Sequence, residues 1–220
     1  MSSHHIVRDD QEPALIIANG EACTLELMNQ LLEWNPLVIV LDSAIQRVIE
    51  LNIKVDVLIG DFDRDFDAMK YKELQYPIDV IHVEDQNSTD LEKAFKYLID
   101  RNIPMVNVIW ATGKRMDHTL GNITCLPKYN NDLKIVILDD FSKIFLLPKS
   151  FKKWYTKDTI LSLIPIGHVE GITTNNLKYP LLNDSLTLGI RIGSSNSANA
   201  DGIVRIEYQS GDLLLIESND

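Results

Sequence analysis

Three short polar motifs in the first 120 residues carry side chains suited to metal and phosphate chemistry. Aspartate oxygens are ligands that Mg²⁺ prefers, and lysine and arginine bind phosphate groups. The motifs therefore predict a magnesium-dependent reaction of a phosphorylated substrate. They read Gly60-Asp61-Phe62-Asp63, Asp85-Gln86-Asn87-Ser88-Thr89-Asp90 and Gly113-Lys114-Arg115-Met116-Asp117-His118.

Each motif follows an apolar run with the composition of a β-strand. The runs are Val55 to Ile59, Ile78 to Val83 and Val106 to Trp110. If these strands are parallel neighbours, the three motifs meet at the edge where open α/β sheets bind ligands. Because alternate residues of an extended segment point to the same side, Asp61 and Asp63 can face one ion.

Helix capping is an alternative role for several of these side chains. Asp63 is a candidate N-cap for a helix that begins near Asp65. Thr89 and Glu92 have the spacing of a capping box, and Asp90 in the first helical turn favours the helix dipole. Sequence spacing alone leaves both the capping and the metal-binding roles open.

The remaining polar residues of the motifs have functional and structural alternatives as well. Asp85 and Gln86 precede the capping box by several residues, which makes them functional candidates. Arg115 stands just before a predicted helix, where exposed amides and an arginine fork form a phosphate site. Asp117 is also a candidate N-cap of that helix, and His118 is either an acid or base or a structural histidine.

Composition limits the class of protein. The chain has 220 residues, 45% hydrophobic content and a net charge of -11, which suits one large core or two modest ones. The negative charge disfavours nucleic acid as a partner and implies that an anionic substrate arrives with metal ions. Cys23 and Cys125 lack the spacing of a zinc or redox site. We expect a cytoplasmic protein, because no apolar run approaches about 20 residues and Met1 to Gln11 does not resemble a signal peptide.

The sequence changes character near residue 140. Before it, apolar runs alternate with helical patterns such as Cys23 to Trp34 and Leu91 to Asp100, which predicts a mostly parallel, Rossmann-like sheet covered by helices. After it, short β-rich runs predict an all-β sandwich. We expect an α/β domain over residues 1–140 and a β-sandwich domain over residues 141–220. The expected strands of the second domain are Ile144 to Leu147, Thr159 to Ile164, Gly171 to Thr174, Ser185 to Leu188, Ile203 to Tyr208 and Leu213 to Ile216.

In this order and spacing, the three motifs resemble those of the thiamine pyrophosphokinase family. The resemblance implies an α/β domain that binds ATP and metal, joined to a β-sandwich that binds thiamine. It also implies transfer of pyrophosphate from ATP to the hydroxyethyl group of thiamine, which yields AMP and thiamine pyrophosphate. A homodimer with a shared active site is implied too. The similarity continues in Leu163-Ile164-Pro165-Ile166-Gly167, Asn176-Leu177-Lys178-Tyr179-Pro180-Leu181 and Ser194-Ser195-Asn196-Ser197.

The resemblance also implies roles for individual residues. Its catalytic residues are Asp61, Asp63, Asp90 and Arg115, of which the three aspartates match the Mg²⁺ ligands. Tyr179 stands where relatives carry an aromatic residue that can stack on the substrate, and the alternative is that it is a β-sheet aromatic. The nucleotide- and thiamine-binding candidates are Asp42, Asp85, Gln86, Thr89, Arg115, Asp117, His118, Tyr179, Ser195 and Asn196.

Two positions depart from the family pattern. Asp42-Ser43-Ala44 replaces Asp-Gly-Gly, and Arg64 replaces a serine, which bears on nucleotide affinity and donor preference. The expected mechanism is an in-line attack of the thiamine hydroxyl on the β-phosphorus, with Asp85 or Asp90 as a candidate general base. Two other functions stay open, namely a metal-dependent nucleotide phosphohydrolase and a thiamine or nucleotide sensor without turnover.

Overall fold

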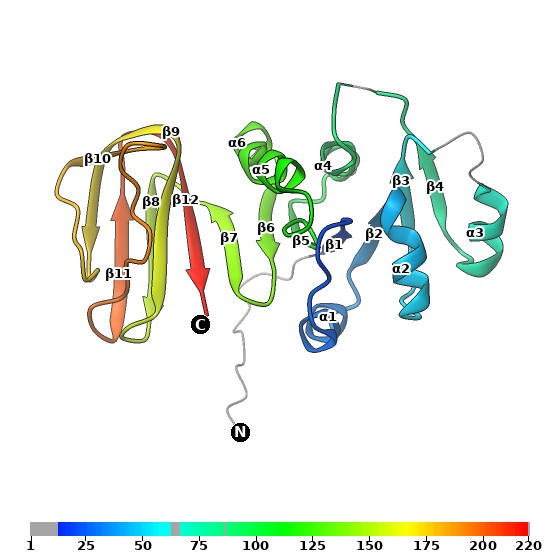
Figure 1. The fold of residues 1–220 in the computed structure, drawn as a ribbon, viewed down its shortest axis with the longest axis horizontal. Helices are drawn as coiled ribbons and strands as arrows, with labels where there is room; N and C mark the ends of the chain where they lie inside the picture. Colours follow the sequence, from blue (N-terminus) through cyan, green and yellow to red (C-terminus); the bar gives the residue numbers. More distant parts are fainter. Residues whose placement is uncertain (1–12, 63–66, 86, 220) are drawn as a thin grey trace.

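Parallel strands form the sheet of the first half in this computed structural model (Figure 1). The structure describes residues 13–62, 67–85 and 87–219. The spatial order of the strands is β4-β3-β2-β1-β5-β6, so the order reverses between β1 and β5. Ligands of open α/β sheets bind outside the carboxyl ends of the strands at such a reversal. The strands are β1 (Ala14–Ile17), β2 (Leu37–Leu41), β3 (Val57–Gly60), β4 (Asp79–His82), β5 (Met105–Ile109) and β6 (Lys134–Leu138).

Helices cover both faces of this sheet (Figure 1). Successive side chains of a strand point to opposite faces, and in β1 Ile16 belongs to the apolar cluster that contains Phe95, while Ile17 belongs to the cluster that contains Met28. All of β1 is buried, which explains why its apolar run lacks polar alternation. The short helix η1 (Asp42–Ala44) follows β2. The α-helices are α1 (Leu25–Leu32), α2 (Ile45–Glu50), α3 (Ala68–Leu74), α4 (Asp90–Asp100), α5 (Met116–Thr124) and α6 (Leu126–Tyr129).

Antiparallel strands continue the sheet into the second half. β6 pairs with β7, and the order then runs β7-β12-β9-β11-β8, with β10 paired to β9. The predicted change from a mostly parallel to an antiparallel arrangement is therefore confirmed. The strands are β7 (Ser142–Leu146), β8 (Ser150–Tyr155), β9 (Ile160–Asn175), β10 (Asp184–Thr187), β11 (Gly202–Glu207) and β12 (Ser210–Ser218).

Two features of the second half differ from the sequence-based expectation. The expected strands Thr159 to Ile164 and Gly171 to Thr174 belong to one strand, β9, which pairs first with β12 and then with β11. Gly167 and Gly171 have positive φ angles and accommodate irregularities in the strand without ending it. The strand β8 was not expected, because two consecutive lysines interrupt its apolar alternation. It lies at the edge of the sheet, where charged residues are common.

The two halves also share buried contacts. Ile144 and Leu214 from the second half belong to the same apolar cluster as Phe95 of α4. The Asp140 carboxylate accepts a hydrogen bond from the Thr24 hydroxyl at 2.7 Å and fixes the start of α1 to the connection between β6 and β7. The domain boundary near residue 140 stays a prediction. Within the described part of the chain, no helix combines the length and apolarity that crossing a membrane requires.

A buried carboxylate joins α4 to α6. Glu92 forms the predicted capping box, because its side chain accepts a hydrogen bond from the Thr89 amide at 3.1 Å while the Thr89 hydroxyl accepts from the Glu92 amide at 3.3 Å. The Glu92 carboxylate also accepts from Lys128 Nζ at 2.7 Å and from the Tyr129 hydroxyl at 2.9 Å. Burial alone would raise the pKa of Glu92, but these donors outweigh burial and lower the pKa.

Replacing Glu92 with glutamine should lower the free energy of unfolding by about 1–3 kcal/mol at neutral pH, because charged hydrogen bonds are lost. The folded-state pKa of Glu92 is lowered, so the stabilisation is complete above its unfolded value of 4.5 and is lost as the pH falls through the folded value. Chemical denaturation at neutral pH and at about pH 3 measures this difference. The exposed Glu73→Gln on α3 is the control, and an equal effect of Glu92→Gln at both pH values would contradict the assignment.

Candidate active site

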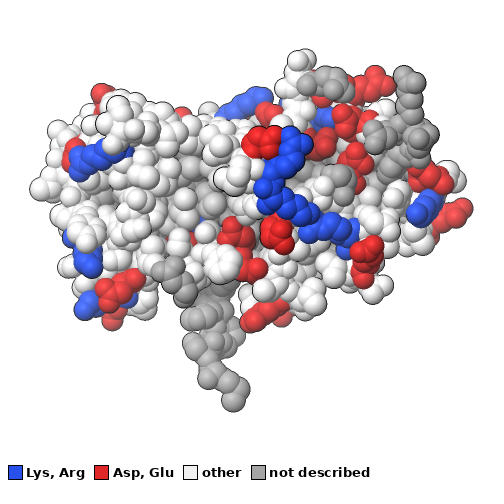
Figure 2. All heavy atoms as spheres, viewed as in Figure 1, with Lys and Arg blue, Asp and Glu red and all other residues white. Residues whose placement is uncertain are grey.

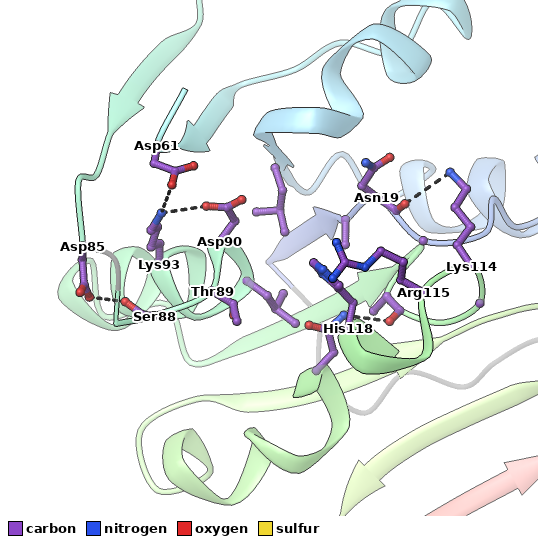
Figure 3. A pocket seen from close by; sticks show the side chains of 17 residues that line it. Asn19, Asp61, Asp85, Ser88, Thr89, Asp90, Lys93, Lys114, Arg115 and His118 are labelled. Carbon is purple, nitrogen blue, oxygen red and sulfur yellow. Dashed lines mark hydrogen bonds and ion pairs between the residues drawn. The ribbon is translucent and has the colours of Figure 1, made fainter. Parts of the chain in front are cut away.

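A cavity of about 450 Å³ lies at the carboxyl ends of the parallel strands, where the order reverses between β1 and β5 (Figure 3). The three motifs, which are far apart in the sequence, therefore contribute to one site. This convergence follows from parallel pairing, because the strands that precede the motifs all end at this edge. The polar residues of the wall are Asn19, Asp61, Asp85, Ser88, Thr89, Asp90, Lys93, Lys114, Arg115, His118 and Asn122.

Charges of opposite sign face one another across this cavity. Figure 3 shows Asp61, Asp90 and Lys93 on one side, with Lys114 and Arg115 on the other. On the molecular surface, basic side chains form a stripe across the centre of the visible face, with acidic side chains beside it (Figure 2). Basic groups bind phosphate and carboxylates bind a hard cation, so the cavity suits a metal-bound phosphate ligand.

Lys93 of α4 lies between two of the predicted metal ligands. Its Nζ atom is 2.9 Å from Asp90 Oδ1 and 3.8 Å from Asp61 Oδ2 (Figure 3). The Lys93 side chain is 2% exposed, whereas the side chains of Asp61 and Asp90 are 44% and 32% exposed. Lys93 was not among the residues predicted from the sequence, although a lysine in the first turn of a helix opposes the helix dipole and was a usable signal.

The carboxylates of the cavity have the donor chemistry that Mg²⁺ prefers. Asp61 and Asp90 both contact one ammonium group, so their oxygens already balance a positive charge and are of the type that Mg²⁺ prefers. Asp63, the third predicted ligand, lies outside the described residues. Among the residues that are described, no three His, Cys, Asp or Glu side chains gather closely enough to hold a metal ion. Metal binding by Asp61, Asp63 and Asp90 stays a prediction.

Asp42 lies beside the cavity, against Gly60. A Cβ atom on Gly60 would be 2.4 Å from the Asp42 Cβ, so only glycine leaves room for the aspartate there. Asp42 begins η1 directly after β2. It is not among the residues that line the cavity, and its contact with a ligand stays a prediction.

The capping alternative for the first motif is wrong. The helix after this motif, α3, begins at Ala68 and not near residue 65. Its N-cap is Asp67, whose carboxylate accepts hydrogen bonds from the amides of Met69 and Lys70 at 3.1 and 3.2 Å. Asp63 is therefore not the cap of α3, and residues 63–66 themselves lie outside the described part of the chain.

Among the described residues, three hydrogen-bond donors hold the Asp85 side chain. Its carboxylate accepts from the Ser88 hydroxyl, from the Asn87 amide at 2.9 Å and from Lys96 Nζ at 3.1 Å. The Ser88 hydroxyl, followed by the other two donors, holds the pKa of Asp85 well below its usual range. Such a carboxylate is a poor proton acceptor near neutral pH. Gln86, the next candidate, lies outside the described residues.

Arg115 and Asp117 form a two-point ion pair at the start of α5. Arg115 Nε donates to Asp117 Oδ1 at 3.1 Å, and Arg115 Nη2 donates to Asp117 Oδ2. The hydrogen bonds from Arg115 lower the pKa of Asp117 to about 2. The N-cap of α5 is Arg115, so the interpretation of Asp117 as the cap is wrong. Arg115 and His118 both line the cavity, whereas Asp117 supports Arg115 from outside its wall.

The candidate thiamine-binding residues of the second half form a separate group. Asn196 is 4% exposed, and its side chain accepts from the Tyr179 amide at 3.0 Å and donates to the Tyr179 carbonyl at 2.8 Å. Asn196 therefore holds the loop that carries Tyr179, a structural role that the sequence did not indicate. Tyr179 and Ser195 are exposed. None of the three lines the cavity between β1 and β5, so one chain does not bring both groups together.

The loop after β1 also belongs to the site and was missed by the sequence analysis. A Cβ atom on Gly20 would lie 2.2 Å from the Thr112 carbonyl oxygen, so glycine permits the loops after β1 and β5 to approach. Arg47 Nη1 donates to Asn19 Oδ1 at 3.1 Å and to the Gly20 carbonyl at 2.9 Å. The signal was available, because Asn19-Gly20 follows an apolar run just as the three motifs do.

Known proteins share both halves of this chain. Residues 28–137 match the family model described as thiamin pyrophosphokinase, catalytic domain, and residues 148–213 match thiamin pyrophosphokinase, vitamin B1 binding domain. Thiamine pyrophosphokinase 1 of Oryza sativa subsp. japonica is 34% identical over 177 residues, which cover 74% of this chain and 66% of the rice protein. Thiamine pyrophosphokinase of Bacillus subtilis is 26% identical over 217 residues, which cover 93% of this chain and 98% of the bacterial protein.

Structural similarity agrees with these matches. The crystal structure of thiamine pyrophosphokinase from Bacillus subtilis has a TM-score of 0.78 and 24% identity, over 94% of this chain and 99% of that chain. It shows that the two proteins share a fold. The family models and the relatives confirm the resemblance drawn from the motifs and the enzyme class that it implied. The chain belongs to the thiamine pyrophosphokinase family.

Proposed function

We propose that this chain transfers the terminal pyrophosphate of ATP to the hydroxyl group of thiamine in the cavity between β1 and β5. The main observation is that Asp61, Asp90 and Arg115 line one cavity at the reversal of strand order. An open α/β sheet binds its ligand at this position, and membership of the family supplies the reaction. A new bond forms between the thiamine oxygen and the β-phosphorus as the bond to the α-phosphate breaks, and AMP leaves.

Arg115 and Lys114 are the proposed contacts for the phosphates of ATP. Both residues line the cavity at the N-terminal end of α5, where backbone amides add to the positive field. The pair with Asp117 engages Nε and Nη2 of the guanidinium and fixes its plane. The Nη1 group is not part of that pair and is the proposed donor to a phosphate oxygen.

Asp61, Asp63 and Asp90 are the proposed ligands of Mg²⁺. When bound, the ion supplies charge neutralisation on the β- and γ-phosphates. The need for such a cation follows from the chain itself, because carboxylates in the wall would repel a triphosphate. Asp61 and Asp90 already have a favourable position for this role, since both carboxylates face the same positive group.

The variant Asp61→Asn should lower kcat by at least about a hundredfold, because a neutral amide is a much weaker ligand for the cation that stabilises the transferred group. Formation of AMP and thiamine pyrophosphate from magnesium-ATP and thiamine measures the effect. Glu84→Gln is the matched control, since Glu84 is an exposed acid near the same sheet edge that does not line the cavity. A folded Asp61→Asn variant with near-normal turnover would contradict the assignment of Asp61 as a ligand of Mg²⁺.

Asp85 is proposed to shape the loop before α4 and not to accept the thiamine proton. Its carboxylate is engaged by Ser88, Asn87 and Lys96, and its pKa is held below the usual range. These donors join Asp85 to Asn87 and Ser88, just before the Thr89 cap of α4, and to Lys96 within the helix. Asp90 remains the candidate general base of the two residues considered for this role.

The variant Asp85→Asn should therefore lower kcat by less than about a hundredfold, since loss of a general base costs roughly 10²- to 10⁴-fold. Turnover measured across the pH range from about 5 to 9 tests this, because a general base leaves an acidic limb in the profile. Loss of that limb in Asp85→Asn, together with a larger fall in kcat, would show that Asp85 accepts the proton.

We also propose a homodimer whose active site is shared between subunits. The support is the separation, within one chain, of Tyr179 and Ser195 from the cavity. Exposed apolar residues occur on both parts, and Met116 and Leu120 of α5 lie one helical turn apart near the cavity. Burial of such surfaces favours association. The exposed apolar residues of the second half include Leu182, Leu188, Ile190 and Ile192.

A mixture of Asp61→Asn and Tyr179→Ala proteins tests the shared site. Each variant alone should be weakly active, because one lacks a metal ligand and the other lacks the aromatic face for thiamine. Heterodimers would contain one intact site, so an equal mixture that exchanges subunits should regain about a quarter of wild-type activity. Absence of recovery despite subunit exchange, verified with a labelled subunit, would exclude a site that combines these two residues from different chains.

A further inference from the structure

Lys93 occupies a position where a lysine is energetically unfavourable. It lies in the first turn of α4, where the helix dipole repels a positive charge. Its side chain is 2% exposed, although lysine is seldom buried without a partner. The capping box needs only Thr89 and Glu92, so helix formation does not account for Lys93. The cost of burying the Lys93 charge at this position must therefore be offset by groups in the cavity that its side chain lines.

The carboxylates of Asp90 and Asp61, which are proposed metal ligands, offset the buried charge of Lys93. Lys93 Nζ donates a hydrogen bond to Asp90 Oδ1 at 2.9 Å and forms a longer ion pair with Asp61 Oδ2 at 3.8 Å. An ammonium group has three donors, and only the contact with Asp90 has the length of a hydrogen bond among the described residues. The ammonium group can therefore bind another acceptor that enters the cavity.

We propose that Lys93 is a resident counter-ion that balances Asp61 and Asp90 before the substrate binds and then donates to the terminal phosphates of the nucleotide. The proposal rests on the proposed function of the cavity. When a divalent cation binds the two carboxylates, it repels the ammonium group at short range. The flexible four-carbon stem of lysine allows the charge to move, and the incoming phosphates offer a new anionic partner.

This role predicts opposite effects on two ligands. Without the ammonium group, the carboxylates lose their competing cation, so Mg²⁺ alone should bind more tightly. The nucleotide loses a charged donor, so its phosphates should bind less tightly when no metal is present. A purely structural ion pair would not produce this combination, because loss of local order would weaken the binding of both Mg²⁺ and the nucleotide.

The test uses Lys93→Met, which keeps the unbranched stem and removes the charge. Titration calorimetry should show Mg²⁺ binding about tenfold tighter than in the wild type, and a non-hydrolysable ATP analogue in EDTA about tenfold weaker. Lys72→Met, on the exposed surface of α3, is the control and should change neither affinity. Nucleotide affinity equal to or above that of the wild type would overturn the proposal, as would weaker Mg²⁺ binding.

The variant Lys93→Gln keeps the test decisive if the methionine variant does not fold. Glutamine retains a donor for Asp90 without the positive charge, so the same two changes are expected with a preserved circular dichroism spectrum. Both measurements report binding and need no turnover. Failure of the Lys93 proposal is thus distinguishable from failure of the proposed reaction, which would appear as absence of AMP formation by the wild type.

Discussion

Balance of negative charge at one edge of the parallel sheet is the constraint on which the site depends. The chain carries a net charge of -11 and places several carboxylates in a cavity proposed to receive a triphosphate. Lys93 offsets Asp61 and Asp90 from within, while Arg115 presents positive charge from the opposite side. The proposed metal ion adds the charge that these side chains cannot supply. The charges of Asp61, Asp90, Lys93 and Arg115 can be understood by their parts in this balance.

The fold keeps these charges close together. Parallel pairing brings the ends of β1, β3, β4 and β5 to one edge, and β1 is buried on both faces beneath it. Glu92 fixes the start of α4 to α6 and thereby supports the helical turn that carries Asp90 and Lys93. Gly20 and Gly60 remove steric obstacles where loops must approach. The buried sheet, the contacts of Glu92 and the glycines of the loops thus all help to hold the charged side chains of the cavity in place.

Sequence reasoning succeeded where one local pattern determines the structure. The three strands that precede the motifs, β3, β4 and β5, are present within two residues of their expected bounds, and the capping box of Thr89 and Glu92 is present. Sequence reasoning missed features that depend on contacts between distant parts of the chain. Ligand binding by Asn196 stays a prediction, but the contacts of its amide with the Tyr179 backbone are ones that no spacing encodes. The role of Lys93 depends on the distance between α4 and the end of β3, which only the folded chain defines.

Product analysis is the most direct test of the central claim that this cavity transfers pyrophosphate from ATP to thiamine. The purified chain is incubated with magnesium-ATP in the presence and absence of thiamine, and AMP, ADP, inorganic phosphate and thiamine pyrophosphate are quantified. We expect AMP and thiamine pyrophosphate in equal amounts, and only when thiamine is present. Release of phosphate from ATP without thiamine, and no thiamine pyrophosphate with it, would contradict the claim and identify a phosphohydrolase.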